Sequence, residues 1–178
     1  VIYLGDTARV PYGEKSPSEI NQIALEVVSW LMRQNVTHLL VACNTTNSLA
    51  LDVVKRVATI PVFDLISSST SMITEQRIGV LATPATVASR AYSNFILAER
   101  PQTFVIEQSC PHFVPMIESG KFYGPRIRQL AKDYLDPLII LYALYPVKPI
   151  FSVLEKTMHV KGLGSFLRLM GCFAIPQK

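Results

Sequence analysis

Cysteine is scarce in this chain, and its scarcity excludes several classes of protein. The 178 residues include only Cys43, Cys110 and Cys172, and no two of them lie close together in the sequence. Such spacing provides no disulfide framework of the kind that stabilises small secreted domains. The three histidines are also scattered, and no Cys/His spacing resembles a metal site. We therefore expect a cytoplasmic protein that holds no metal.

Long apolar runs are missing as well. Hydrophobic residues make up 49% of the chain, yet no run reaches the ~18 residues that are needed to cross a bilayer. The chain does not open with a basic segment followed by an apolar stretch, so no signal peptide is visible. We expect no membrane partner. The sequence also lacks a Gly-rich phosphate loop, a dinucleotide-binding fingerprint and a GxSxG elbow.

The positive charge is confined to one end of the chain. Residues 1–139 contain 12 Lys/Arg and 12 Asp/Glu, whereas residues 140–178 contain five Lys/Arg and only Glu155. A neutral body lacks the basic stripe that a nucleic-acid-binding surface requires, so we expect no nucleic-acid partner. The basic tail is interpreted as a solvated segment, and contact with phosphates or membranes is the alternative.

Apolar periodicity predicts alternating strands and helices. Ser16, Pro17 and Glu19 form a helix-starting pattern, and apolar residues follow at helical spacing through about residue 34. Strands are expected at 2–5, 37–43, 60–65, 77–83 and 103–108. Helices are expected at 17–34, 46–58 and 84–99, after Ser67, and from about 125 to 139. This alternation predicts an α/β fold with a mostly parallel sheet. Beyond residue 140 the sequence predicts no regular element and no partner strand.

The segment LLVACNTTNS (39–48) places Cys43 between an apolar strand and a predicted helix start. Free cysteine is usually a small buried hydrophobe, and that interpretation stays open here. The alternative is a reactive thiol, because unpaired amides at a helix N-terminus stabilise a thiolate and hold carboxylates. Polar neighbours, Asn44 and Thr45 among them, favour the second interpretation.

Two further segments carry polar residues that can bind an anion. ATPAT (82–86) puts Thr83 and Thr86 at another strand-to-helix junction, where ordinary helix capping is the simpler explanation. VPYG (10–13) is either a tight turn or part of a site. Together these segments suggest an anion site with a thiol base. Asp6, Asp64 and Glu118 are possible acids without a local partner, and Cys110 is interpreted as structural.

Four motifs in order, YLGDTARVPYG, VACNT, IGVLATPAT and CPHFVPMIE, resemble those of the cofactor-independent aspartate/glutamate racemases, most closely the glutamate branch. The resemblance runs from about residue 1 to 138. It implies a two-lobed α/β fold that is incomplete here. Residues 1–84 would form the first lobe without its opening strand, 85–139 a partial second lobe, and 140–178 a divergent basic tail.

The resemblance also implies an activity: interconversion of L- and D-glutamate by two thiols without any cofactor, supplying D-glutamate for peptidoglycan. Cys43 would be the first catalytic thiol and Glu118 an auxiliary acid. The substrate would be held by Tyr12, Gly13, Asn44, Thr45, Thr83 and Thr86. Glutamate is the expected partner, and a homodimer is possible.

Two family features are missing from the sequence. The chain begins after the family's opening strand and DSG-type loop, and it lacks the second cysteine motif, GCTHYP; Tyr145 and Pro146 would correspond to the end of that motif. We therefore expect impaired racemisation and a chain prone to associate. The alternatives are a non-catalytic glutamate-binding protein, a decayed remnant, or an aspartate racemase.

Overall fold

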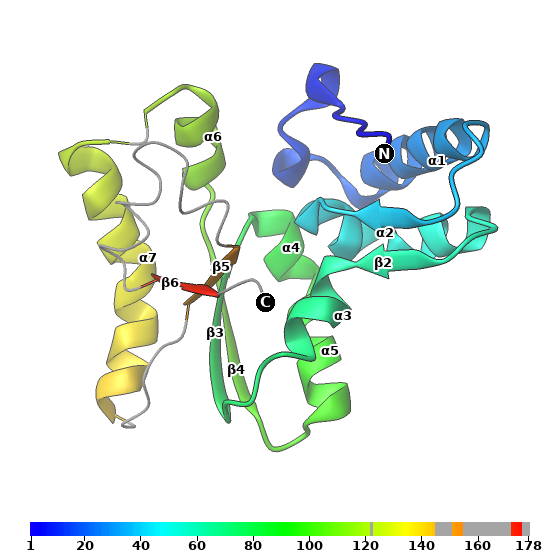
Figure 1. Ribbon diagram of the computed structural model, residues 1–178. Helices are drawn as coiled ribbons and strands as arrows, with labels where there is room; N and C mark the ends of the chain where they lie inside the picture. The colour runs from blue at the N-terminus through cyan, green and yellow to red at the C-terminus, as the bar shows by residue number, and fades with distance from the viewer. Residues whose placement is uncertain (122, 145–150, 155–171, 176–178) are drawn as a thin grey trace.

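The computed structural model describes residues 1–121, 123–144, 151–154 and 172–175 (Figure 1). Two 3-10 turns, η1 (Thr7–Arg9) and η2 (Tyr12–Glu14), come first. They are followed by α1 (Pro17–Met32), β1 (Leu39–Val41), α2 (Asn44–Val57), β2 (Val62–Asp64), α3 (Leu65–Thr70), β3 (Arg77–Ala82), α4 (Pro84–Ser89), α5 (Ala91–Glu99), β4 (Phe104–Ser109), α6 (Phe113–Glu118) and α7 (Pro125–Leu144). β5 (Phe151–Leu154) and β6 (Cys172–Ile175) complete the described elements.

The strands pair in parallel, which confirms the predicted α/β class. β1 pairs with β2 so that Leu40 lies opposite Phe63, and β3 pairs with β4 so that Ala82 lies opposite Ser109. Parallel pairing needs a crossover between the strands, and helices provide it in both cases. The carboxyl ends of each pair therefore lie at the same edge, where ligands of such sheets bind.

The first apolar core lies between α1, α2 and β1. The predicted capping box starts α1: the Ser16 side chain accepts from the Glu19 amide, and the Glu19 side chain accepts from the Ser16 amide. This start sets the helix so that Ile20 and Val28 are buried against Leu39. The opposite face of the β1–β2 sheet is open: the side chains of Leu40 and Phe63 are 65% and 53% exposed.

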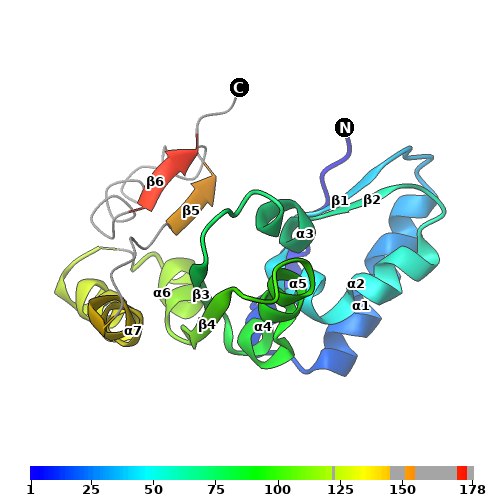
Figure 2. The same cartoon turned by 90° about the horizontal axis from the view of Figure 1, so that it is seen from below.

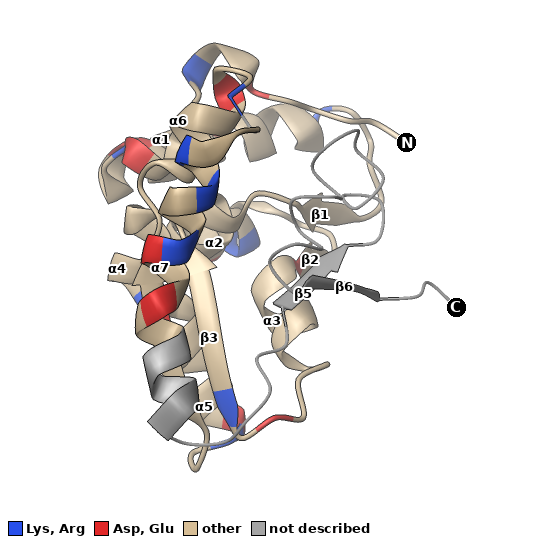
Figure 3. Ribbon diagram, turned by 90° about the vertical axis from the view of Figure 1, so that its left-hand side faces the viewer, with Lys and Arg blue, Asp and Glu red and all other residues tan. Residues whose placement is uncertain are grey.

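The β3–β4 sheet is covered on both faces. α7 packs on β4 from one side, and α4 and α5 pack on it from the other (Figures 1 and 2). Leu138 of α7 lies over Gly79 of β3, where a Cβ would stand 3.2 Å from Leu138 Cδ1. Basic residues gather in the first part of α7 and acidic ones follow them (Figure 3). In the described part of the chain, no helix combines the length and apolar character required to cross a bilayer.

Three sequence predictions of secondary structure are wrong. Residues 2–5 form no strand, since they pair with no described strand. The helix expected at 84–99 is broken into α4 and α5 at Arg90, whose left-handed φ of 54° ends the first helix. β6 pairs with β5, so a segment that was expected to lack a partner strand has one. The division into lobes stays a prediction, and Tyr145 and Pro146 lie outside the described residues.

Candidate functional site

Cys43 lies where β1 passes into α2. It is the N-cap residue of α2, and its half-buried side chain forms no cap hydrogen bond. The next three amides, of Asn44, Thr45 and Thr46, donate to no described group. Unpaired amides at the start of a helix attract negative charge, so this end of the 14-residue α2 presents a thiol beside an anion-binding backbone.

Three threonine hydroxyls form a chain beside this helix start. Thr83 caps α4 by accepting from the Thr86 amide at 3.4 Å, and its hydroxyl donates to Thr86 Oγ1 at 3.1 Å. Thr45 Oγ1 lies 3.5 Å from Thr83 Oγ1 and joins α2 to α4. The structure thus brings together two junctions that are 38 residues apart. Thr45 and Thr86 are buried, whereas Thr83 is partly accessible.

Gly13 packs directly against this chain of hydroxyls. A Cβ at residue 13 would stand 2.7 Å from both Cβ and Cγ2 of Thr83, closer than any side chain tolerates. Only glycine therefore allows η2 to approach the α4 start this closely. Gly13 is itself buried.

Tyr12 belongs to a hydrogen-bonded cluster with Asp6 and Arg9. The Tyr12 hydroxyl donates to Asp6 Oδ2, to which Arg9 Nε also donates at 2.6 Å. Arg9 also donates through Nη1 to Glu26 Oε2 on α1, at 2.6 Å. Burial and the Asp6 carboxylate raise the pKa of Tyr12, and together they outweigh the opposing charge of Arg9. The expectation that Asp6 has no local partner is wrong.

Asn47 was not singled out from the sequence, yet it organises the Cys43 turn. Its side-chain amide donates to the carbonyls of Val41 and Cys43, both at 2.8 Å, and its Oδ1 accepts from the Leu65 amide at 3.1 Å. The buried Asn47 side chain therefore ties the end of β1 to the start of α3. Only the run of polar residues after Cys43 hinted at such a role.

A small, mostly apolar pocket lies between η2, α4 and the segment that follows β4. Gly13, Thr83, Cys110 and Val114 are among the residues that line it. Cys110 is buried, and burial raises its pKa to about 11, so its thiol is protonated at neutral pH. The Cys110 amide donates to the Ala82 carbonyl at 2.8 Å and holds the two strand ends together.

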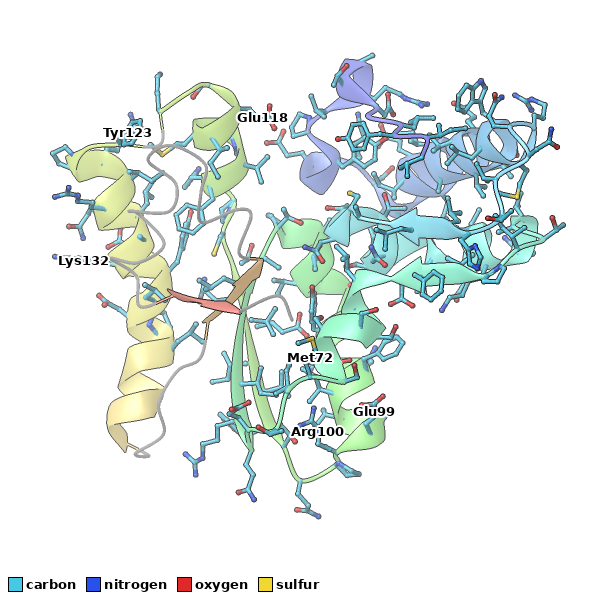
Figure 4. The ribbon with its side chains drawn as sticks, in the orientation of Figure 1. Met72, Glu99, Arg100, Glu118, Tyr123 and Lys132 are labelled. Atoms are coloured by element: carbon cyan, nitrogen blue, oxygen red, sulfur yellow. The ribbon has the colours of Figure 1, made fainter. Side chains whose placement is uncertain are left out.

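Glu118 takes no part in the hydrogen bonds described around Cys43 and the three threonines. It is exposed at the end of α6, at the same end of the molecule as η1 and η2 (Figure 4). Its carboxylate forms no hydrogen bond or ion pair with a described residue. Asp64 caps α3 and contacts Lys55, so the expectation that it lacks a local partner is wrong. The described residues include no cluster of three His, Cys, Asp or Glu able to hold a metal ion.

Comparison with known proteins finds racemases. The profile of the family "Asp/Glu/Hydantoin racemase" matches residues 1–134. The glutamate racemase of Prochlorococcus marinus (strain NATL1A) is 57% identical over 138 residues, 78% of this chain and 52% of the relative. That of Synechococcus sp. (strain CC9605) is 54% identical over the same shares. The chain spans about half the length of the curated relatives it matches.

Solved structures give the same result. The crystal structure of glutamate racemase from Francisella tularensis subsp. tularensis SCHU S4, in complex with D-glutamate, has a TM-score of 0.79 at 32% identity, over 97% of this chain and 64% of that chain. The glutamate racemase of Campylobacter jejuni subsp. jejuni has a TM-score of 0.73 at 28% identity, over 96% of this chain and 68% of that chain.

Proposed function

Because this chain belongs to the Asp/Glu/Hydantoin racemase family, we propose that it binds glutamate at the start of α2 and that Cys43 transfers the Cα proton. The observation that carries the proposal is the position of the Cys43 thiol, half-buried beside three unpaired amides and the Thr45–Thr83 hydroxyl pair. The relatives named glutamate racemase support glutamate rather than aspartate as the substrate.

The reaction needs a base, a charge-stabilising site and an acid. The Cys43 thiolate removes the Cα proton, and the electron pair left on Cα spreads into the substrate carboxylate. The unpaired amides stabilise the charge that develops on the carboxylate oxygens, and the threonine hydroxyls hold the starts of α2 and α4 together beside them. A proton delivered to the opposite face inverts the centre, whereas return of the first proton restores it. Tyr12, Gly13, Asn44 and Thr86 complete the proposed binding set, and no cofactor takes part.

The lack of a second positioned thiol among the described side chains limits the activity that we propose for this chain. Of the described side chains, the only other thiol belongs to Cys110, which is buried among its neighbours and not presented to a ligand at Cys43. Without a second positioned acid, we propose that Cys43 exchanges the Cα proton mainly with retention. Inversion would then be slower by about 10²–10⁴, the factor that a positioned acid or base supplies. We also propose that the protein is cytoplasmic and supplies D-glutamate for peptidoglycan. Its two lobes would enclose the site, with Glu118 as an auxiliary acid, and two copies would form a homodimer.

Proton exchange and inversion are measured separately in D₂O. Proton NMR follows loss of the Cα signal of each glutamate enantiomer, and chiral chromatography follows inversion. We expect Cα exchange to exceed inversion, to vanish in Cys43→Ser and to persist in Cys110→Ser. Calorimetry with both glutamate enantiomers, and aspartate for comparison, measures binding. Binding without exchange would favour the non-catalytic glutamate-binding alternative, and the absence of both would overturn the proposal.

A further inference from the structure

Tyr92 reaches the Cys43 helix start from a distant part of the chain. It lies on α5, 48 residues beyond Asn44, and its hydroxyl donates to Asn44 Oδ1 at 2.7 Å. This hydrogen bond joins α5 to the first residue of α2. Asn44 directly follows Cys43, so the contact fixes a side chain next to the proposed base.

The contact determines which end of the Asn44 side chain is available. A carboxamide accepts hydrogen bonds through its oxygen and donates them through its NH₂ group. Tyr92 occupies the oxygen, while the NH₂ group donates to no described residue and the side chain is exposed. Asn44 therefore offers donors, and not an acceptor, beside the unpaired amides of α2.

Tyr92 is held firmly enough to set this orientation. The next residue, Ser93, is 1% exposed, and its amide donates to Glu107 Oε1 on β4 at 2.9 Å. The start of α5 is thereby fixed to the β3–β4 sheet. Burial raises the pKa of Tyr92 and outweighs a hydrogen bond from Ser69, so the phenol stays protonated and donates.

We propose that Tyr92 is a positioning residue that holds the Asn44 amide with its NH₂ group toward the carboxylate of a ligand bound beside Cys43. The identity of that ligand as an amino acid rests on the proposed function. The orientation itself does not, because any carboxylate at the start of α2 meets the same donors.

The test uses two alkylating reagents of similar size on the intact chain. Iodoacetate carries a carboxylate and iodoacetamide does not, so the ratio of their rates at Cys43 reports carboxylate recognition. Peptide mass mapping separates Cys43 from the other cysteines. We expect Tyr92→Phe to lower the ratio roughly three- to tenfold, the effect of one hydrogen bond. Asn44→Ala should lower it as much, and the double variant no further.

Controls separate orientation from folding. Tyr3→Phe removes a hydroxyl from an exposed tyrosine and should leave the ratio unchanged. Thermal unfolding of Tyr92→Phe should match that of the unmutated chain within a few degrees. NMR of the ¹⁵N-labelled chain provides a measurement that needs no Tyr92 variant. The signal of the Asn44 NH₂ group should shift on titration with acetate and not with acetamide.

Specific results overturn the proposal. One is an unchanged ratio of the iodoacetate and iodoacetamide rates in Tyr92→Phe or in Asn44→Ala. Another is a further fall of this ratio when Tyr92→Phe is added to Asn44→Ala. The third is an Asn44 NH₂ signal that does not shift on titration with acetate. If glutamate does not bind but the ratio falls as expected, the proposed function fails and the positioning role stands. If glutamate binds and the ratio is unchanged, the reverse holds.

Discussion

The backbone of Gly13 lies against the side chain of Thr83, although the two residues are 70 positions apart. A Cβ on Gly13 would stand 2.7 Å from two carbon atoms of Thr83. Thr83 in turn caps α4 and reaches Thr45 on α2. The relationship therefore couples η2, α2 and α4, the three elements around the proposed binding site.

Gly13→Ala should displace Thr83 and weaken both folding and glutamate binding. Forcing one methyl group into a packed contact costs about 1–3 kcal/mol. Urea unfolding measures the loss of stability, and calorimetry with D-glutamate measures the loss of affinity. Gly5→Ala is the matched control, because the atoms nearest to its Cβ would belong to the exposed ring of Tyr3, at 3.3 Å or more. Equal stability of the two variants would contradict the steric argument.

Asn47→Ala should be among the more destabilising substitutions near the site. It removes the side-chain partner of the Val41 carbonyl and of the Leu65 amide, whereas the Cys43 carbonyl keeps the Asn47 backbone amide at 2.9 Å. Unpaired buried groups cost about 1–3 kcal/mol each when water cannot reach them. We expect a loss of about 2–4 kcal/mol in the free energy of unfolding, measured by urea denaturation, together with faster alkylation of Cys43.

Ser48→Ala is the control for Asn47, because Ser48 lies next to it on α2 and donates only to the Asn44 carbonyl. Its loss should cost well under half as much. If both variants unfold at the same urea concentration, Asn47 does not organise the Cys43 turn.

Local sequence signals predicted the starts of elements well and their long-range contacts poorly. The Ser16–Glu19 capping box and the positions of Cys43 and Thr83 after strands are confirmed, since each depends on neighbouring residues. The break at Arg90 was missed, because no Gly or Pro marks it and the left-handed residue is an arginine. The contact of Tyr92 with Asn44 depends on how distant elements pack, and no local pattern encodes it.

Asp64 should make the protein sensitive to acid. Burial alone would raise its pKa, but hydrogen bonds from Ser67 and the charge of Lys55 outweigh burial and hold the pKa below its ordinary value. A lowered native pKa stabilises the fold above the unfolded-state pKa of about 3.9, and the contribution is lost as the pH falls below that value. Asp64→Asn should therefore make the unfolding free energy depend less on pH below about pH 4. It should also lower the unfolding free energy at pH 7 by about 1–2 kcal/mol.

Asp52→Asn gives the comparison, because Asp52 is an exposed acid on α2. Chemical denaturation at a series of pH values should show an unchanged acid limb for this variant. An Asp64→Asn limb as steep as that of the unmutated chain would show that the Asp64 carboxylate does not carry the acid sensitivity.

The open face of the β1–β2 sheet should drive self-association. Leu40 and Phe63 lie opposite each other in register, both more than half exposed, and the His38 ring stacks on Phe63 at 6.0 Å. Each of the two strands has one described neighbour, so an apolar face adjoins unpaired backbone edges, a combination that favours pairing with another chain.

Leu40→Thr combined with Phe63→Thr keeps residues suited to strands but removes apolar area. Sedimentation velocity should then show a shift toward the monomer, whereas Leu25→Gln, at an exposed apolar position on α1, should not. Equal association of both variants would place the contact elsewhere, because only the double variant alters the sheet face.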